Sequence, residues 1–390
     1  MVAVGWVEHA KPSVGGSIQD QRHPQPAGRP GQSKEQPIPR QTLTVLAGRR
    51  ALAILRRDGL SAQALRVITG ASGGPKWFVL YGLDRALWGE FLRDAPEPLH
   101  LVGSSSGSWR FACAARDDPL TALQRFADSY VAQCYPPRPS PADVTGTARG
   151  TLDEVLGEAG AAEIAANPRR RLHLLAARLR GTDERSGVLL PRLGAAAALN
   201  AVSRRALGVF VERALFHAGG EAGPLARWRD LPTRHLELTA GNLAAALLAS
   251  GSIPGVMEPV NSIPGAPAGL YCDGGITDYH IDSSFDLVPG ELVLQPHFHR
   301  RVVPGWFDKA LPWRGNSRDK LADTVLLAPS PEFVAALPGG RIPDRHDFKR
   351  LDDATRQRDW RKVLGESERL GEEFLELVRT GEIARVAQPM

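Results

Sequence analysis

Two short apolar segments limit the fold more than any other feature, because each runs directly into a glycine-rich turn and then a helix-forming stretch. Residues 65–68 lead into the turn 70–74, and Pro75 stands where proline is favoured at the start of a helix. Residues 99–102 lead into the turn 103–107 in the same way. Strands that alternate with helices across short turns are typical of a mainly parallel sheet. The sequence therefore predicts an α/β fold.

The remaining pattern divides the chain into three parts. Pro, Gly and Gln occupy 16 of the first 40 positions, and such a composition cannot bury enough apolar surface to offset the entropy of ordering. Residues 1–40 are therefore predicted to be a disordered tail. Residues 41–340 are predicted to hold the α/β domain, with an Ala- and Arg-rich helical insertion around 136–230, and residues 341–390 a C-terminal helical extension.

Periodicity predicts further elements inside the α/β domain. Residues 43–57 have the apolar spacing of an amphipathic helix. Additional short strands are expected at residues 172–175, 236–239, 269–272, 292–294 and 325–327.

Charge and cysteine content exclude several classes of protein. Lys and Arg outnumber Asp and Glu by 48 to 43, a net charge of +5 that favours weak contact with anionic surfaces. This charge is not the dense basic stripe of a nucleic-acid binder, and we expect no nucleic-acid partner. Three cysteines without a CxxC pair argue against a disulfide framework or zinc ribbon and fit a reducing compartment. No apolar run reaches the roughly 18 residues that span a bilayer. We expect a cytoplasmic protein, with membrane contact that is peripheral and weak.

The pattern Gly103-x-Ser105-x-Gly107 is the sharpest candidate for chemistry. It lies between an apolar strand and a helix, where a tight turn exposes the serine hydroxyl near backbone N–H groups that can stabilise an oxyanion. Glycines suit this turn because the backbone is strained and neighbouring segments pass close to it. A flexible Gly/Ser linker is the other interpretation, but a linker would not stand between two core elements. Ser105 is therefore the candidate nucleophile.

A second glycine-rich turn, Gly73-Gly74-Pro75-Lys76, follows the first strand. Two adjacent glycines at a helix start leave backbone N–H groups uncovered, and Lys76 adds positive charge, which together favour an anion site. The spacing of a nucleotide-binding phosphate loop is absent. An ordinary turn before a helix with a solvated lysine is the alternative interpretation.

A third turn, Asp273-Gly274-Gly275, places a carboxylate at a strand end where another loop can approach closely. Alone it is first of all a turn signal. Together with Ser105 and the turn at Gly73, it completes the nucleophile, proton acceptor and oxyanion donors that acyl transfer requires, at the sheet edge where α/β proteins bind ligands.

In this order the three motifs resemble those of the patatin-like phospholipases, which carry a G-G-x-[RK] loop, then GxSxG, then D-G-[GA]. The stretch Ala-Ser-Gly-Ser-Ile-Pro at 249–254 is similar to the A-S-x-A-x-P segment that precedes the aspartate in that family. The resemblance covers roughly residues 60–290 and leaves the C-terminal hundred residues unexplained. It implies a three-layer α/β/α fold with a mainly parallel sheet, to which helical additions are attached.

The resemblance also implies residue roles in the hydrolysis of lipid acyl esters. Ser105 would be the nucleophile and Asp273 the base of a Ser–Asp dyad that works through an acyl-enzyme, while Gly73 and Gly74 supply oxyanion N–H groups. Pro75 has no N–H, so the remaining donor would be the amide of Ser106. The motif residues expected to support this arrangement are Lys76, Gly103, Gly107, Gly274 and Gly275.

The sequence departs from the family pattern at two positions. Ser72 and Trp77 stand where the family usually has glycine. These departures leave open a second hypothesis, in which the fold is a catalytically idle lipid-binding module.

A third hypothesis is an α/β-hydrolase with a Ser-Asp-His triad. Its histidine would be His280, His297 or His299, which follow Ser105 and Asp273 in the order that such a triad requires. That fold does not need the Gly73-Gly74 and Asp273-Gly274-Gly275 turns.

No cofactor and no metal site are predicted. Neither the pair His297 and His299 nor the set of nearby carboxylates matches a zinc or EF-hand spacing; the carboxylates are Asp273, Asp278, Asp282 and Asp286. The expected partner is a lipid or acyl-ester substrate. The apolar stretch 193–216, which contains paired arginines, is interpreted as core or lid rather than as a membrane-surface helix.

Overall fold

The computed structural model describes residues 41–181, 189–315 and 318–390, so the predicted tail at 1–40 lies outside the described residues. Within them, ten strands form one mixed sheet in the order β10-β1-β9-β8-β2-β3-β4-β5-β6, with β7 paired to β4. The strands are β1 (Leu43–Ala47), β2 (Leu65–Gly70), β3 (Leu99–Ser104), β4 (Arg170–Leu179), β5 (Val211–Ala218), β6 (Thr233–Leu238), β7 (Tyr271–Asp273), β8 (Leu292–Pro296), β9 (Thr324–Pro329) and β10 (Gln388–Pro389).

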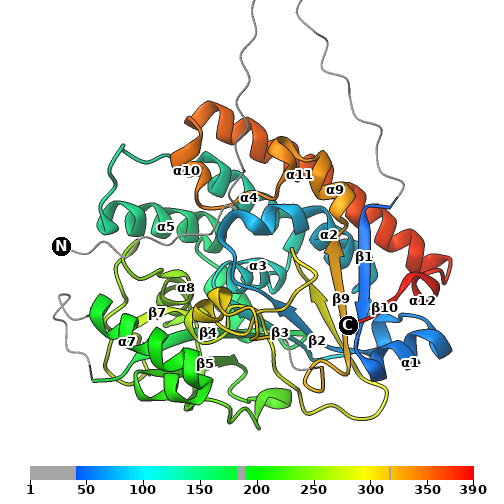
Figure 1. Cartoon of the computed structure of the whole chain (residues 1–390), viewed down its shortest axis with the longest axis horizontal. Helices are drawn as coiled ribbons and strands as arrows, with labels where there is room; N and C mark the ends of the chain where they lie inside the picture. Colours follow the sequence, from blue (N-terminus) through cyan, green and yellow to red (C-terminus); the bar gives the residue numbers. More distant parts are fainter. Residues whose placement is uncertain (1–40, 182–188, 316–317) are drawn as a thin grey trace, which may run out of the picture. The chain divides into compact units, whose positions relative to one another are not determined.

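The centre of the sheet is parallel, and helices cover both of its faces (Figure 1). Strands β9, β8, β2, β3 and β4 run in one direction, whereas β1, β5 and β7 run against their neighbours β9 and β4. The predicted three-layer α/β/α fold with a mainly parallel sheet is confirmed. The helices are α1 (Arg49–Asp58), α2 (Tyr81–Ala86), α3 (Ser106–Ala114), α4 (Pro119–Ala132), α5 (Pro141–Leu156), α6 (Gly160–Ala166), α7 (Leu189–Val202), α8 (Leu243–Gly251), α9 (Pro331–Ala336), α10 (Asp347–Arg350), α11 (Asp353–Arg379) and α12 (Ile383–Val386).

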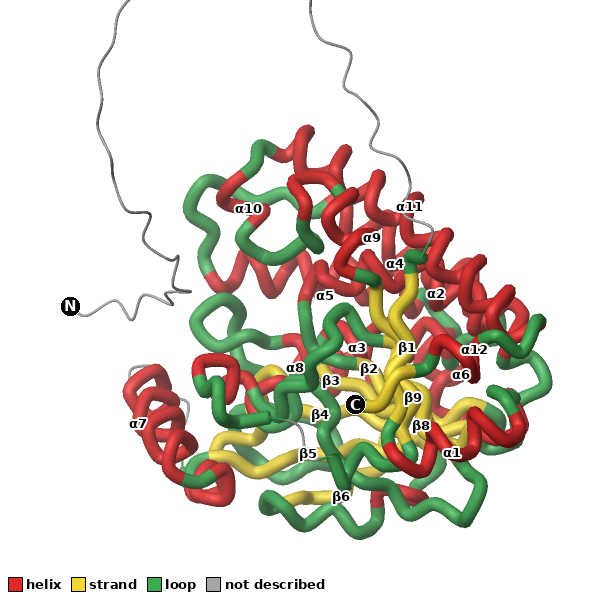
Figure 2. The backbone as a smooth tube through the Cα atoms, turned by 45° about the vertical axis from the view of Figure 1, so that its right-hand side comes forward, coloured by secondary structure: helices red, strands yellow, loops and turns green. Residues whose placement is uncertain are grey.

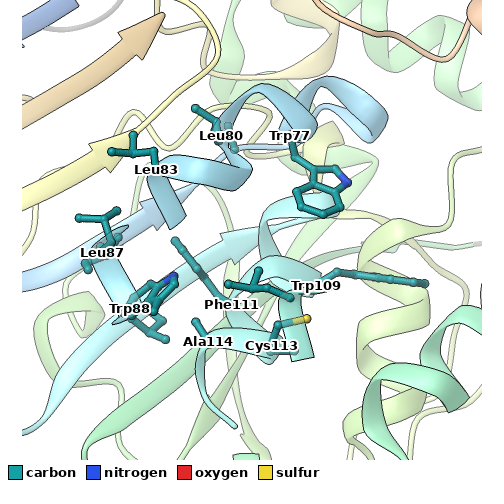
Figure 3. Close-up of a cluster of buried hydrophobic side chains, with 14 of the residues drawn as sticks. Trp77, Leu80, Leu83, Leu87, Trp88, Trp109, Phe111, Cys113 and Ala114 are labelled. Carbon is teal, nitrogen blue, oxygen red and sulfur yellow. The ribbon is translucent and has the colours of Figure 1, made fainter. Parts of the chain in front are cut away.

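Side chains alternate along each strand, so apolar residues pack on both faces of the sheet. In β3, Leu99 and Leu101 face the larger core, whereas Val102 faces the other side of the sheet, as the two-residue period of a strand requires. The larger core lies under α2, α3, α4 and α11, and Figure 3 shows the part of it around Trp77, Trp88 and Phe111. On the opposite face, α7 and the short helices η5 (Arg204–Val209) and η8 (Trp306–Ala310) pack over β4 and β5.

Four histidines form a row across that second face, which we call the histidine ladder. Ring nitrogens of His100 and His173 lie 2.8 Å apart, those of His173 and His217 2.8 Å, and those of His217 and His235 2.7 Å. The rings come from β3, β4, β5 and β6 in turn. Burial lowers the pKa of His100 to about 4 and that of His217 to about 3, and it also lowers the pKa of the other two rings. The ladder is therefore neutral near pH 7.

The prediction of a single helix over residues 43–57 is wrong. Residues Leu43–Ala47 form β1, which is paired with both β9 and β10, and α1 begins only at Arg49. The chain turns at Gly48, where an added Cβ would lie 1.9 Å from the carbonyl oxygen of Leu321. All five residues of β1 are buried, which suits a strand that is covered on both faces. This burial outweighs the helical spacing of the apolar residues.

The segment 136–230, predicted as a helical insertion, is only partly helical. It contains α5, α6 and α7, but also β4 and β5, which lie inside the sheet. The strand predicted at residues 172–175 lies inside β4, whereas β5 was not predicted. The Ala-rich composition of the segment favours helix over strand, and pairing with β4 and β6 overrides it in β5.

The segment 341–390 packs into the domain and does not extend from it. The backbone N–H of Gly82 in α2 donates to Ser367 Oγ in α11 at 2.9 Å, and a Cβ on Gly371 would lie 2.5 Å from the carbonyl oxygen of Gly82. The segment also ends in β10, which pairs with β1. Figure 2 shows α11 running alongside α2 and α4.

Candidate active site

Strand β4 aligns the two residues that the sequence predicts as a dyad. Its residues 170–175 pair with β3, and its next three residues pair with β7, which runs in the opposite direction. Ser104 is thus opposite Leu175, and Asp273 is opposite the following residue, Ala176. Because β3 and β7 meet end to end along β4, the residue after β3 is brought to the last residue of β7.

Ser105 stands on a strained turn between β3 and α3. Its φ is +52°, and it is the only non-glycine residue of the described ranges with a positive φ. Its hydroxyl donates a hydrogen bond of 2.8 Å to Asp273 Oδ2. Both side chains are buried within the protein. The structure therefore brings the predicted nucleophile and base into direct contact.

The Asp273 carboxylate is poised as a proton acceptor near neutral pH. Its second oxygen, Oδ1, accepts the backbone N–H of Gly275 at 2.7 Å, which fixes the carboxylate plane toward Ser105. Burial raises the pKa of the Asp273 carboxyl to about 6, against the lowering effect of the two hydrogen bonds and of the nearby charges on Lys309 and Arg345. A base of this pKa is ionised for the most part at pH 7 while it remains basic enough to take a proton.

The loop 71–74 lies against residues that neighbour both members of the dyad, Ser104 and Gly275. Ser72 Oγ donates to Ser104 Oγ at 2.9 Å, and a Cβ on Gly275 would lie 2.8 Å from the same Ser72 oxygen. Within the described ranges, the amide of Gly73 has no hydrogen-bond acceptor, and Gly74 begins a short helix whose first N–H groups lack intrahelical partners. These two amides are thus the uncovered donors nearest in sequence to the Ser72 contact.

Glycines are required by close backbone approach at three of the motif positions. A Cβ on Gly107 would lie 2.2 Å from the carbonyl oxygen of Gly70, and one on Gly274 would lie 2.2 Å from that of Leu175. A Cβ on Gly103 would lie 2.6 Å from the backbone of Ser108. Because each contact is with backbone rather than with a flexible side chain, a larger residue would displace the turn at Gly107 from β2 or the turn at Gly274 from β4, or would distort the turn 103–108 itself.

Two serines that sequence reasoning gave no role complete the network. Ser250 Oγ accepts the backbone N–H of Ser105 at 3.0 Å and donates to the carbonyl oxygen of Leu175 at 2.6 Å, which holds the strained turn against β4. Ser72, which departs from the family pattern, joins the loop at Gly73 to the end of β3 through its hydroxyl. The small-residue stretch at 249–254 was the available signal for Ser250, but a sequence does not show which hydroxyl faces the turn.

Lys76 lies beside the loop at Gly73, next to Phe298. Its Nζ is 5.7 Å from the centre of the Phe298 ring, and a Cβ on Gly73 would lie 2.6 Å from that same ring. Trp77, the other departure from the family pattern, is buried and stacks on Phe126 with ring centres 4.5 Å apart. Its side chain points into the core, so it leaves the loop at Gly73 unobstructed.

Of the three histidines of the triad hypothesis, His280 and His297 are buried and His299 is exposed, and none is joined to the site. Within residues 41–181, 189–315 and 318–390, no histidine ring hydrogen-bonds to Ser105 or Asp273. His280 Nδ1 instead accepts the Val303 N–H at 2.8 Å, and His297 Nδ1 contacts the backbone of His299. Burial lowers the pKa of each of these three rings.

The carboxylates considered as metal ligands have other partners. Asp278 forms a two-point ion pair with the buried Arg213, with both distances 2.7 Å. The described side chains include no group of three or more His, Cys, Asp or Glu residues that could hold a metal ion.

The same part of the chain has no helix of the length and apolar character needed to cross a bilayer.

Comparison with known proteins gives one family match. A family model described as patatin-like phospholipase matches residues 71–280, the range that contains Gly73, Ser105 and Asp273. Among solved structures, VipD from Legionella pneumophila is similar over 69% of this chain, with 12% identity and a TM-score of 0.30, and this chain spans 55% of the length of that one. No curated protein matches the sequence.

Proposed function

We propose, from the premise that the chain belongs to the patatin-like phospholipase family, that it hydrolyses lipid acyl esters with Ser105 as nucleophile and Asp273 as general base. Hydrolysis of lipid acyl esters is the activity of the family. The assignment of the two residues rests on one observation above all, the 2.8 Å hydrogen bond from the Ser105 hydroxyl to Asp273 Oδ2 on a turn with φ of +52°.

The first half of the proposed reaction acylates the enzyme. Asp273 takes the proton of the Ser105 hydroxyl as Ser105 Oγ attacks the ester carbonyl carbon and forms a tetrahedral oxyanion. When this intermediate collapses, the bond to the alcohol oxygen breaks, and the proton on Asp273 passes to that leaving oxygen. The products of this half are the free alcohol and an acyl ester on Ser105.

The second half returns the enzyme to its starting state. Asp273 takes a proton from water, whose oxygen attacks the acyl-enzyme carbonyl, and the second tetrahedral intermediate releases the fatty acid while the proton returns to Ser105. The amides of Gly73 and Gly74 are proposed to donate to the oxyanion in both halves, with the Ser106 amide as a further donor. Pro75 contributes none, because it has no N–H.

The supporting residues keep these groups in register. Gly107 and Gly274 allow close backbone approach to β2 and β4, Gly103 allows its turn to fold against Ser108, and Gly275 supplies the N–H that orients Asp273. Ser72 and Ser250 are proposed as positioning residues, because their hydroxyls fix the oxyanion loop and the strained turn. Lys76 would add positive charge beside the loop.

Hydrolysis of a panel of lipid esters tests the proposal. The native chain and Ser105→Ala are compared on phospholipids, diacylglycerols and a short-chain soluble ester. Ser129→Ala is the matched control, because Ser129 lies in α4 and its hydroxyl donates to Thr151 in α5. Loss of a single nucleophile should lower the rate by at least about 10³-fold, while the control keeps it. Turnover that survives in Ser105→Ala would contradict the assignment, and a native chain that hydrolyses none of the esters would favour the idle lipid-binding module.

A further inference from the structure

The positive charge of the chain is concentrated in two segments that are distant in sequence. Residues 189–209 hold three basic and no acidic residues, and residues 300–315 hold four basic residues and one acidic residue. Together they carry +6, whereas the rest of the chain sums to −1 against a total of +5. The mild overall bias therefore arises almost entirely from these two stretches.

The two segments pack against each other. Asn200 Nδ2 in α7 donates to Asp308 Oδ1 at 2.7 Å, and the Arg314 guanidinium donates to the carbonyl oxygen of Asn200 at 2.6 Å. Asp308 is fully buried and also pairs with Arg204 at 3.2 Å. Since the one acidic side chain of the two segments is buried and paired, the surface that they present to solvent is cationic.

Large apolar side chains stand out on this same cationic surface. Val202 at the end of α7 is 85% exposed, Trp313 is 70% exposed, and Leu199 is 42% exposed. Leu199 and Val202 are three residues apart and so share one side of the helix, and the neighbour of Trp313, Arg314, bonds to the last turn of that helix. Figures 1 and 2 show α7 at the periphery of the fold, beyond β5. We call Leu199, Val202, Arg205 and Trp313 the α7–Trp313 surface.

This surface adjoins the candidate active site through a short chain of contacts. Arg204 donates to the carbonyl oxygen of Thr277, four residues after Asp273. Lys309 Nζ lies 3.7 Å from the centre of the Tyr279 ring. Tyr279 in turn donates its N–H to Pro304 and accepts the N–H of Ser72 at 2.8 Å, so the same short stretch contacts both the cationic loop and the oxyanion loop.

We propose that the α7–Trp313 surface docks the protein on an anionic lipid bilayer. Tryptophan and exposed aliphatic side chains enter the headgroup region, and arginines beside them attract anionic lipids, which is the combination that interfacial membrane segments use. The surface adjoins the edge of the sheet that carries Ser105 and Asp273, so docking would bring lipid esters to the dyad. That last step rests on the proposed function, whereas docking itself does not.

Sedimentation with vesicles tests the docking. The full chain carrying Ser105→Ala, which leaves the vesicles intact, is mixed with phosphatidylcholine vesicles with and without phosphatidylglycerol. We expect binding to the anionic vesicles that weakens as salt is raised, and little binding to phosphatidylcholine alone. Absence of binding to the anionic vesicles, or equal binding to both kinds, would overturn the proposal.

Two variants and two matched controls locate the contact. Arg205→Glu and the double variant V202S/W313S should each weaken binding about tenfold. Two controls should leave binding unchanged: Arg361→Glu, at an exposed position of α11, and Val288→Ser, which removes a valine that is 63% exposed. Equal weakening in variants and controls would overturn the proposal, as would self-association of the chain that V202S/W313S abolishes, since a second copy would then cover the surface. Esterase activity is measured separately, so a failed dyad and a failed docking surface give different results.

Discussion

Strand β3 contributes to two buried polar clusters, and the two differ in how their hydrogen bonds are completed. His100, its second residue, belongs to the histidine ladder, in which each interior ring is paired with the rings on either side. Ser105, just beyond its end, belongs to a cluster of loops that only glycines allow to meet. The ladder joins neutral rings to one another and leaves only its last ring, that of His235, with a buried nitrogen that has no partner among the described residues. The loop cluster instead keeps an ionisable carboxylate beside a hydroxyl on strained backbone.

The comparison indicates that burial of polar groups has two purposes in this fold. In the middle of strands, the regular backbone fixes side chains that complete one another and contribute stability. Beyond the strand ends, the backbone can adopt the strained turns that present a reactive group. We therefore expect substitutions in the ladder to change stability and substitutions in the loop cluster to change activity.

The largest expected effect is that of Asp273→Asn on activity. The amide keeps the size of the carboxylate but cannot take the Ser105 proton, so kcat/KM on a soluble ester should fall by about 10³-fold or more. The melting temperature should stay close to that of the native chain, because a buried carboxylate with a raised pKa is replaced by a neutral group. Activity within tenfold of native would show that Asp273 is not the base.

A pH profile of the rate should show the next largest effect. Below a pKa of about 6 the Asp273 carboxyl is protonated and cannot accept a proton, so kcat/KM should fall about tenfold for each further unit of acidification and level off above pH 7. Circular dichroism at each pH verifies that the chain remains folded. A rate that is flat from pH 5 to pH 8 would contradict the role of an aspartate base with this pKa.

His173→Phe should have the opposite signature from Asp273→Asn. The substitution removes two ring contacts at 2.8 Å and leaves buried nitrogens of His100 and His217 without partners, which costs about 1–3 kcal/mol each. We expect a melting temperature lower by about 5–10 °C and an unchanged rate per folded molecule. A lower rate without a change in melting temperature would place the ladder in the reaction.

The smallest expected effect concerns how the stability of the fold depends on pH. The histidine ladder and Asp273 change this stability in opposite directions. An unfolded histidine has a pKa of about 6.5, and the ladder histidines have lower pKa values in the folded chain. At a pH between these values the unfolded chain binds more protons than the folded chain, so acidification destabilises the fold. Asp273 acts in the opposite direction, because its raised pKa makes the folded state bind a proton more readily.

The melting temperature of the native chain should therefore fall from pH 7 to pH 5, and that of Asp273→Asn should fall more steeply. His280, His297 and His299 add to the same downward trend in both proteins, because their pKa values are lowered too. An equal slope in both proteins would show that Asp273 has no raised pKa in the folded state.

The sequence predicted the parts of this molecule that depend on local pattern. Strand, glycine turn and helix recur with enough regularity to indicate the layers of the fold and the three motif loops. It did not predict the ladder, because His100, His173, His217 and His235 come from four strands whose register is a tertiary property. The roles of Ser72 and Ser250 could not be predicted for the same reason. They depend on which loop each hydroxyl contacts, and only the tertiary structure determines this.

Two other features required the structure. Residues 43–47 carry apolar side chains at a spacing that fits helix and strand alike, and only their pairing with β9 and β10 decides between them. The cationic surface was missed because its two segments are more than ninety residues apart. Whole-chain net charge reports neither the segments nor their contact.

Covalent labelling of the native chain tests the central claim most directly. A fluorophosphonate reacts with a serine only when a base and an oxyanion site activate it, and digestion followed by mass spectrometry identifies the modified residue. We predict a single adduct on Ser105, lost in Ser105→Ala and strongly slowed in Asp273→Asn. An unlabelled native chain, or an adduct on another serine that persists in Ser105→Ala, would contradict the account.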